Sequence, residues 1–222
     1  MLEGIKAIIF DIDGTLLDSM YVWTDIDDIF VEKYNLTPPD TFHSGMEGKS
    51  YSETAEYFLE IFPTLTQSSE ELQQEWYDMA YDIYGHDIQI KKGAYKFLQH
   101  LKENGYKLGI ATSNNKDLAV HGLKAHGVYE LFDVICTAGE VGAGKPAPDV
   151  YLKVAKDLGI KPQHCLVFED VPMGILAGKN AGMKVCAVED TFSAPQIQKK
   201  KELADYYIHD YDDILKGTFE VL

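Results

Sequence analysis

Short apolar runs recur along the chain, and helical patterns separate most of them. The first run, KAIIF at residues 6–10, is nearly continuous, as expected for a strand buried on both faces of a sheet. Three of the helical patterns end at Gly105, Gly159 and Gly182, where left-handed C-caps belong. Strands that alternate with helices predict βαβ units on a parallel sheet, and therefore an α/β fold. The other four runs are 107–112, 133–138, 165–169 and 184–188.

The segment from Asp18 to about Lys92 breaks this alternation, because it shows helical periods and no convincing strand. Ser68 and Glu71 have the spacing of a capping box ahead of one helix. The apolar and aromatic stripes of this segment are typical of a packed helical core, which we favour over a cofactor pocket. The stripes are Val22/Ile26/Ile29/Phe30, Ala55/Phe58/Leu59/Phe62 and Leu72/Trp76/Met79/Ala80/Ile83.

The simplest domain organisation is a small helical domain inserted after the first strand of an α/β domain. The helical domain comprises residues 18–90, and the α/β domain comprises residues 1–17 and 91–222. We expect two exposed loops, near residues 16–20 and 86–92, to carry the chain between the domains.

Charge and composition narrow the possible partners and the location. The formal net charge is −16, so the surface repels the phosphates of nucleic acids and anionic lipids. No apolar stretch has the roughly 18–20 residues that a membrane span needs, and no signal peptide is recognisable. Cys136, Cys165 and Cys186 lack the spacing of a zinc site or a redox pair, so we expect small buried side chains. A cytoplasmic protein that binds neither nucleic acid nor membrane is expected, and its oligomeric state is unknown.

Two aspartates, Asp11 and Asp13, directly follow the first apolar run. In an open parallel sheet, ligands bind beyond the carboxyl ends of the strands. Two carboxylates separated by one residue repel each other unless a cation or a proton lies between them. This pattern suits a Mg²⁺ site in which one carboxylate is ligand and nucleophile and the other is a proton donor. An EF-hand is excluded because Gly14 is the fourth loop residue from Asp11, not the sixth, and a solvated turn is a weak alternative.

Two further strand ends supply groups that complement the aspartates. Thr112, Ser113 and Asn114 end the second apolar run and precede a helix, whose free N–H groups favour a phosphate, although simple N-capping explains these residues equally well. Glu169 and Asp170 end the fourth run. Four acidic groups from two strand ends make a site for a hard cation, and Mg²⁺ suits oxygen ligands shared with a phosphate.

Lys145 lies in GEVGAGKPAPD, which matches most of a phosphate-binding P-loop. A working P-loop has Ser or Thr after its lysine, whereas Pro146 follows here and disfavours a helix at Lys145. The P-loop interpretation is therefore rejected. A better role for Lys145 is a single cation that balances Asp11 and binds a phosphoryl oxygen, and a surface lysine in a Gly-Pro turn is the alternative.

Together these motifs resemble the haloacid dehalogenase superfamily, in its branch with a helical cap after the first strand. The matching motifs are DIDGT at 11–15, Thr112, Lys145 in GKPAPD, and EDVPMGI at 169–175. The resemblance extends from about residue 6 to residue 188. It implies a Rossmann-like three-layer sandwich with a parallel sheet, plus an inserted all-α cap domain.

The resemblance also implies a mechanism, that of a Mg²⁺-dependent phosphatase. Asp11 would attack phosphorus and form an aspartyl-phosphate, while Asp13 would protonate the leaving alcohol and then activate water. The implied phosphate-binding residues are Thr112, Ser113, Asn114 and Lys145, and the implied metal ligands are Asp11, Asp13 through its carbonyl, Asp170, and Glu169 directly or through water.

Two other activities stay open, and a third is disfavoured. A dehalogenase would attack carbon and need neither a metal nor a proton donor, so Asp13 and the Glu169–Asp170 pair argue against it. A mutase of the β-phosphoglucomutase type fits the layout, but relatives of that type carry a His and a basic residue where Trp23 and Tyr51 stand, so hydrolysis is favoured. A regulatory module that accepts phosphate without turnover is the alternative from another class.

A cap over the site favours a small phosphorylated metabolite as the substrate, such as a sugar phosphate or a nucleoside monophosphate. Trp23 and Tyr51 could stack on a base or a sugar, or they could serve in packing. Lys49, in EGKS, is the nearest cap candidate for contact with the substrate, and an exposed loop lysine is an equal alternative.

Overall fold

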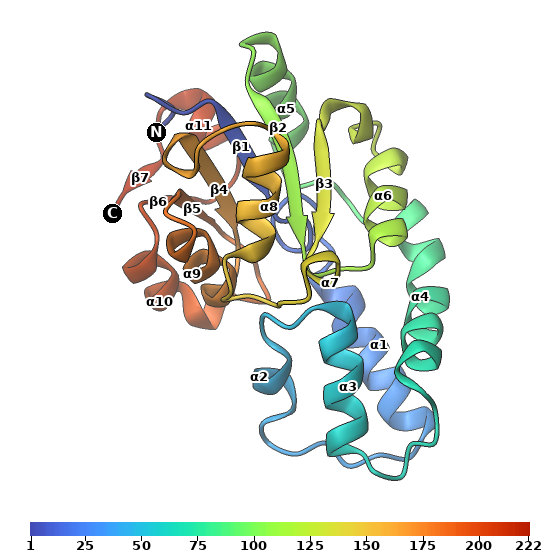
Figure 1. The fold of residues 1–222 in the computed structure, drawn as a ribbon. Coiled ribbons are helices and arrows are strands. Elements are labelled where there is room, and N and C mark those ends of the chain that lie inside the picture. The colour runs from blue at the N-terminus through green and yellow to red at the C-terminus, as the bar shows by residue number, and fades with distance from the viewer.

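A seven-stranded sheet forms the centre of the larger lobe of the computed structural model, which describes residues 1–222 (Figure 1). The strand order is β3-β2-β1-β4-β5-β6-β7, and all neighbours are parallel except β6 and β7. The five predicted strands are present within one residue at each end, which confirms the α/β fold. The strands are β1 (Ala7–Phe10), β2 (Lys107–Thr112), β3 (Val134–Thr137), β4 (Cys165–Glu169), β5 (Lys184–Val188), β6 (Tyr206–Ile208) and β7 (Glu220–Val221).

Strand β1 shows why the apolar runs are continuous. All four of its residues are buried. Ile8 and Phe10 belong to one hydrophobic cluster, and Ala7 and Ile9 belong to the other. Because successive side chains point to opposite faces of a sheet, a strand covered on both faces has no polar position to alternate with.

Helices cover both faces of the sheet and produce the predicted three layers. The first hydrophobic cluster contains side chains from α5 and α6, and the second contains side chains from α8 and α9. Gly105, Gly159 and Gly182 have φ of +79°, +71° and +74° just beyond α5, α8 and α9, which confirms them as left-handed caps. The elements of this lobe are α5 (Ala94–Glu103), α6 (Lys116–Ala125), α7 (Ala138–Val141), α8 (Asp149–Asp157), α9 (Pro172–Asn180), α10 (Ile197–Leu203), α11 (Asp212–Lys216) and three 3₁₀ turns, Tyr129–Leu131, Pro162–His164 and Ala194–Gln196.

Four helices form the second lobe, at the carboxyl ends of the central strands (Figure 1). An aromatic cluster holds this helical lobe together: the ring centroids of Phe58 and Trp76 are 4.9 Å apart, and those of Phe30 and Phe58 are 5.7 Å apart. The predicted capping box at Ser68 and Glu71 is present. The helices are α1 (Met20–Lys33), α2 (Phe42–Met46), α3 (Tyr51–Ile61) and α4 (Ser69–His86).

The two crossings between the lobes run side by side. Leu17 forms an antiparallel bridge with Ile90, and the Lys91 N–H donates to the Leu16 carbonyl at 2.8 Å. Leu16 and Leu17 are buried, so the expected exposed loop near residues 16–20 is wrong there. The physical reason is that the first crossing is a paired segment whose apolar side chains join the core.

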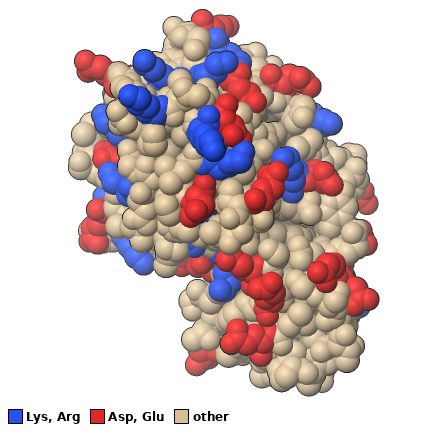
Figure 2. All heavy atoms as spheres, in the orientation of Figure 1, with Lys and Arg blue, Asp and Glu red and all other residues tan.

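Among the charged side chains on the visible face of the helical lobe, the acidic ones predominate (Figure 2). Between residues 18 and 90 the only lysines are Lys33 and Lys49, and the whole chain contains no arginine. The three cysteines are free and buried, as expected. None of the helices combines the length and the hydropathy that crossing a bilayer requires.

Candidate active site

A cavity of about 540 Å³ lies where the two lobes meet. Parallel strands bring their carboxyl ends to one edge of the sheet, which is why residues distant in sequence gather here. Of the predicted site residues, only Glu169 does not line the cavity, because it is fully buried. The predicted residues that line it are Asp11, Asp13, Trp23, Lys49, Tyr51, Thr112, Ser113, Asn114, Lys145 and Asp170.

Lys145 forms two buried ion pairs. Its Nζ lies 2.6 Å from Asp11 Oδ1 and 2.5 Å from Glu169 Oε1. Burial raises the pKa of Asp11 above its usual value, Lys145 opposes that increase, and Glu169 and Asp13 add smaller increases. Burial alone would lower the pKa of Lys145, but Asp11 and Glu169 together raise it above its usual value. Lys145 is therefore a charged ammonium beside Asp11, and the surface-lysine alternative is wrong. The Lys145–Pro146 peptide bond is cis.

Glu169 accepts four hydrogen bonds or ion-pair contacts. Its Oε1 accepts from Lys145 and from the Tyr151 hydroxyl at 2.8 Å, and its Oε2 accepts from the backbone N–H groups of Asp170 and Val171. A Cβ at position 174 would lie 1.8 Å from Glu169 Oε1, so only glycine lets α9 pack against this carboxylate. Glu169 holds Lys145 in place, and its predicted role as a metal ligand stays a prediction.

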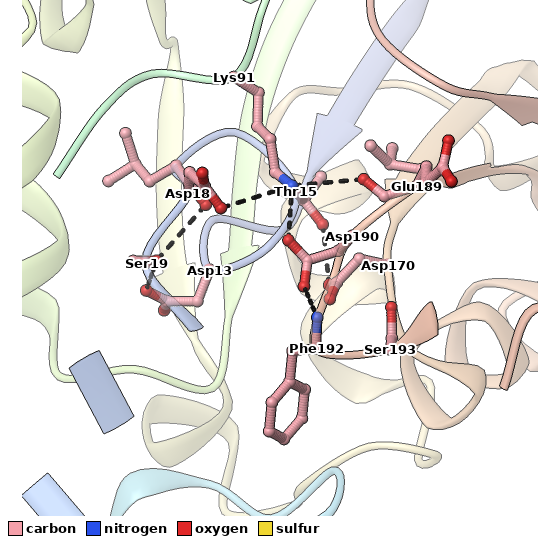
Figure 3. A network of polar contacts seen from close by, with 12 residues as sticks. Asp13, Thr15, Asp18, Ser19, Lys91, Asp170, Glu189, Asp190, Phe192 and Ser193 are labelled. Carbon is pink, nitrogen blue, oxygen red and sulfur yellow. Dashed lines mark hydrogen bonds and ion pairs between the residues drawn. The ribbon is translucent and has the colours of Figure 1, made fainter. Parts of the chain in front are cut away.

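Asp170 has one carboxylate oxygen without a partner. Oδ1 accepts from Thr15 Oγ1 at 3.1 Å (Figure 3), whereas the buried Oδ2 has no hydrogen bond. Burial, followed by Glu169 and Asp11, raises the pKa of Asp170 well above its usual value. Carboxylate oxygens of Asp11, Glu169 and Asp170 all lie within 4.8 Å of one another. A buried carboxylate without a counter-charge is costly, and oxygen ligands at this spacing fit a divalent cation.

Three side-chain donors hold Asp13. Ser19 Oγ donates to Oδ1 at 2.6 Å (Figure 3), and Asn114 Nδ2 donates to Oδ2 at 2.9 Å. The Tyr84 hydroxyl also donates to Oδ1. Tyr84 was not predicted as a site residue, since it is one of several apolar and aromatic positions on α4 and only the packing of that helix brings it to Asp13.

The residues after β2 divide into two groups. Thr112 Oγ1 accepts from the Asn114 N–H at 3.0 Å, which leaves its own proton free to donate, and the buried Ser113 Oγ has no partner. Both hydroxyls are therefore available to a phosphate. Asn114 is not, because its side-chain amide is directed to Asp13 and Tyr84. Asn115, which was not among the predicted residues, caps α6 by accepting from the N–H groups of Asp117 and Leu118. The N-capping alternative for Thr112, Ser113 and Asn114 is therefore wrong.

The predicted cap residues take part in packing as well as lining the cavity. The rings of Trp23 and Tyr51 are 5.9 Å apart, and their polar atoms donate to the Tyr84 hydroxyl and to the Gln73 carbonyl, respectively. Lys49 is half-buried, with its Nζ 5.6 Å from the centroid of the Tyr57 ring. It is thus not the exposed loop lysine of the alternative interpretation.

A second polar network braces the rim of the cavity (Figure 3). Lys91 Nζ, on the second crossing, lies 2.5 Å from Asp190 Oδ2 and 3.3 Å from the Glu189 carbonyl. Asp190 Oδ1 accepts from the Phe192 N–H at 2.9 Å. Phe192 lines the cavity, so this network ties the crossing to the loop after β5 that helps to enclose the site.

Comparisons with known proteins agree with this geometry. A family profile described as haloacid dehalogenase-like hydrolase matches residues 8–188. The chain is 34% identical over 198 residues to (DL)-glycerol-3-phosphatase 2 of Arabidopsis thaliana, and this alignment covers 84% of this chain and 80% of that protein. It is 31% identical over 213 residues to hexitol phosphatase A of Escherichia coli, and this alignment covers 94% of this chain and 93% of that protein. The solved β-phosphoglucomutase of Clostridium difficile shares the fold, with a TM-score of 0.79 at 23% identity over 96% of each chain.

Proposed function

Because the chain belongs to the haloacid dehalogenase-like hydrolase family and is a phosphatase, we propose that it hydrolyses a small phosphomonoester through an aspartyl-phosphate on Asp11. One observation carries this proposal. At the floor of the cavity, Asp11 is paired with the Lys145 ammonium and lies beside the unpartnered oxygen of Asp170. A nucleophile, a phosphate-binding cation and a place for a metal ion are thus present together.

The proposed reaction has two steps that use the same residues. An oxygen of Asp11 forms a bond to phosphorus, the bond from phosphorus to the leaving oxygen breaks, and Asp13 gives that oxygen its proton. Asp13 then takes a proton from water, which attacks the phosphorus, releases inorganic phosphate and restores Asp11. Lys145, Thr112 and Ser113 donate to the phosphoryl oxygens in both steps, which stabilises the charge that develops there.

We propose Mg²⁺ as the metal, held by Asp11, Asp170 and the Asp13 carbonyl, with Glu169 as a further ligand. The unpartnered buried oxygen of Asp170 supports this assignment. So does Gly14, because a Cβ there would lie 2.3 Å from that same oxygen. When bound, the ion would neutralise charge on the carboxylates and on the phosphoryl group.

The proposed substrate is a small phosphorylated metabolite of the sugar phosphate or nucleoside monophosphate type. The helical lobe, residues 18–90, acts in this proposal as a cap that excludes water and large substrates. Support comes from the cavity of about 540 Å³ and from relatives named for glycerol 3-phosphate and hexitol phosphates.

Phosphate release from a panel of small esters tests the proposal. We expect continuous turnover with Mg²⁺, loss of turnover with a chelator, and at least ~10³-fold lower kcat for Asp11→Asn, because the nucleophile is gone. Asp157→Asn, a change in a surface carboxylate on α8, is the matched control and should leave turnover unchanged. Turnover that survives both the chelator and Asp11→Asn would overturn the proposal, and isomerisation of β-glucose 1-phosphate without net phosphate release would favour the mutase instead.

A further inference from the structure

The carboxylate of Asp13 is held partly by a residue of the helical lobe, Tyr84, whose hydroxyl is fully buried. We propose that Tyr84 is a positioning residue: its hydroxyl orients the Asp13 carboxylate toward the oxygen of the leaving alcohol. This inference rests on the proposed function, because it concerns the proton that Asp13 transfers.

The direction of the hydrogen bond between Tyr84 and Asp13 follows from the other partners of the Tyr84 hydroxyl. A phenolic hydroxyl donates once and accepts with its lone pairs. Trp23 Nε1, which can only donate, gives it a hydrogen bond at 2.9 Å, and Asn114 Nδ2 gives a second at 3.0 Å. The orientation of the Asn114 amide is set because its Oδ1 accepts from the Asn115 N–H at 2.6 Å. With two donors already directed at its oxygen, the Tyr84 hydroxyl donates to Asp13.

The position of the Tyr84 ring is fixed by close packing of α4 on α6. A Cβ at Gly122, on α6, would lie 3.2 Å from Tyr84 Cδ1, and a Cβ at Gly85 would lie 2.6 Å from His121 Nε2. Tyr81 stacks on His121 with ring centroids 4.0 Å apart. The end of α4 is therefore anchored to the α/β lobe, so that the Tyr84 hydroxyl has a fixed position relative to β1 and Asp13.

This arrangement has a consequence that depends on the leaving group. An alkoxide leaves slowly unless it is protonated, whereas p-nitrophenolate leaves without a proton. A misoriented Asp13 therefore slows the hydrolysis of alkyl phosphates more than that of p-nitrophenyl phosphate. The value of kcat/KM reports on steps up to release of the alcohol, so a slow second step does not hide the difference.

The experiment compares Tyr84→Phe with the unmodified protein on glycerol 3-phosphate and on p-nitrophenyl phosphate. We expect kcat/KM to fall about 10-fold for the alkyl ester and less than about 2-fold for the aryl ester, since general acid catalysis contributes ~10²–10⁴ and orientation is part of it. Tyr207→Phe is the matched control, because Tyr207 is also buried and its hydroxyl has no partner. It should leave both values unchanged.

An equal fall for both esters, or no fall for either, would overturn the inference. Both esters are measured on the same preparation, so partial unfolding of Tyr84→Phe lowers both rates together and leaves their ratio unchanged. In an Asp13→Asn background, Tyr84→Phe should have no further effect on the alkyl ester, because a residue that acts through Asp13 is non-additive with it. Failure of the proposed function is distinct: Asp11→Asn would then retain turnover whatever Tyr84→Phe does.

Discussion

At the scale of single residues, Asp27 is a carboxylate that the proposed chemistry does not use. It lies on α1, lines the cavity and has a side chain that is 16% exposed. Burial, followed by the neighbouring Asp28, raises its pKa to about 7 from an ordinary value of 3.8. Between these pH values the folded chain holds a proton that the unfolded chain has released. The free energy of unfolding therefore falls as pH rises through this window. Above pH 7 the folded chain bears the full cost of an ionised, largely buried Asp27.

Asp27→Asn removes this cost and should stabilise the fold at high pH. We expect the variant to be more stable than the unmodified protein by up to roughly 4 kcal/mol at pH 8, since the pKa is raised from 3.8 to about 7 and one pKa unit corresponds to about 1.4 kcal/mol. Near pH 4 the two should be almost equal. Urea unfolding at both pH values measures the difference, with the exposed Asp25→Asn on the same helix as the control. A stability difference that does not change with pH would show that ionisation of Asp27 is not its cause.

Site residues at the ends of strands could be predicted from the sequence, whereas those on helices could not. Asp11, Thr112 and Asp170 directly follow or end strands, and the edge of a parallel sheet brings such residues together whatever the helices do. Tyr84 and Tyr151 could not be predicted, because each reaches the site from within a helix, Tyr84 in the last turn of α4 and Tyr151 in the first turn of α8. Their contacts depend on the packing of α4 on α6 and of α8 on the sheet, which apolar periodicity does not specify.

At the scale of elements, the loop of GEVGAGKP meets a loop of the helical lobe. A Cβ at Gly144 would lie 2.4 Å from Glu53 Oε2 and 2.7 Å from the Gly48 carbonyl oxygen. The Gly144 N–H donates to Glu53 Oε1 at 3.3 Å, and the Tyr51 N–H donates to the Ser113 carbonyl at 3.0 Å. The glycine that resembled part of a P-loop thus permits close contact between the lobes beside Lys145.

Gly144→Ala should separate these two loops. We expect KM to rise about 10-fold, because the new methyl group clashes at the contact between the lobes. The melting temperature should change little, because the clash lies in neither hydrophobic core. Gly142→Ala, in the same loop, is a strict control: its Cβ would meet nothing within 4 Å, although its φ of +71° costs some backbone strain. Steady-state kinetics beside thermal unfolding gives the comparison. Equal effects of the two changes on KM would mean that the lobe contact is not responsible.

The strands that escaped prediction were the short ones at the sheet edge. Strand β6 has three residues and β7 has two, too few for a periodic pattern to stand out. The paired crossing at Leu17 was misjudged for a similar reason, since a single bridge to Ile90 has no sequence signature. The long central strands and helices were predictable because each has one or two complete apolar faces.

At the scale of the whole molecule, the distribution of charge limits what the leaving group can be. Arginine, which binds carboxylates and phosphates with two parallel hydrogen bonds, is absent from the chain. Lys145 and Lys49 are the lysines that line the cavity, and Lys145 is already paired with two carboxylates. Acidic residues from the helical lobe, Asp27, Asp40 and Glu47, line the same space.

A leaving group with its own negative charge should therefore be disfavoured. Glycerol 3-phosphate and 3-phosphoglycerate make a matched pair, because a hydroxymethyl group in one replaces a carboxylate in the other. We expect kcat/KM to be at least about 10-fold higher for glycerol 3-phosphate. A tenfold ratio corresponds to about 1.4 kcal/mol, which is within the repulsion energy of two partly screened charges. The ratio should shrink as ionic strength rises, because salt screens that repulsion. Equal rates for the two esters, with 3-phosphoglycerate alone slowed by Lys49→Gln, would instead reveal an anion-binding position at Lys49.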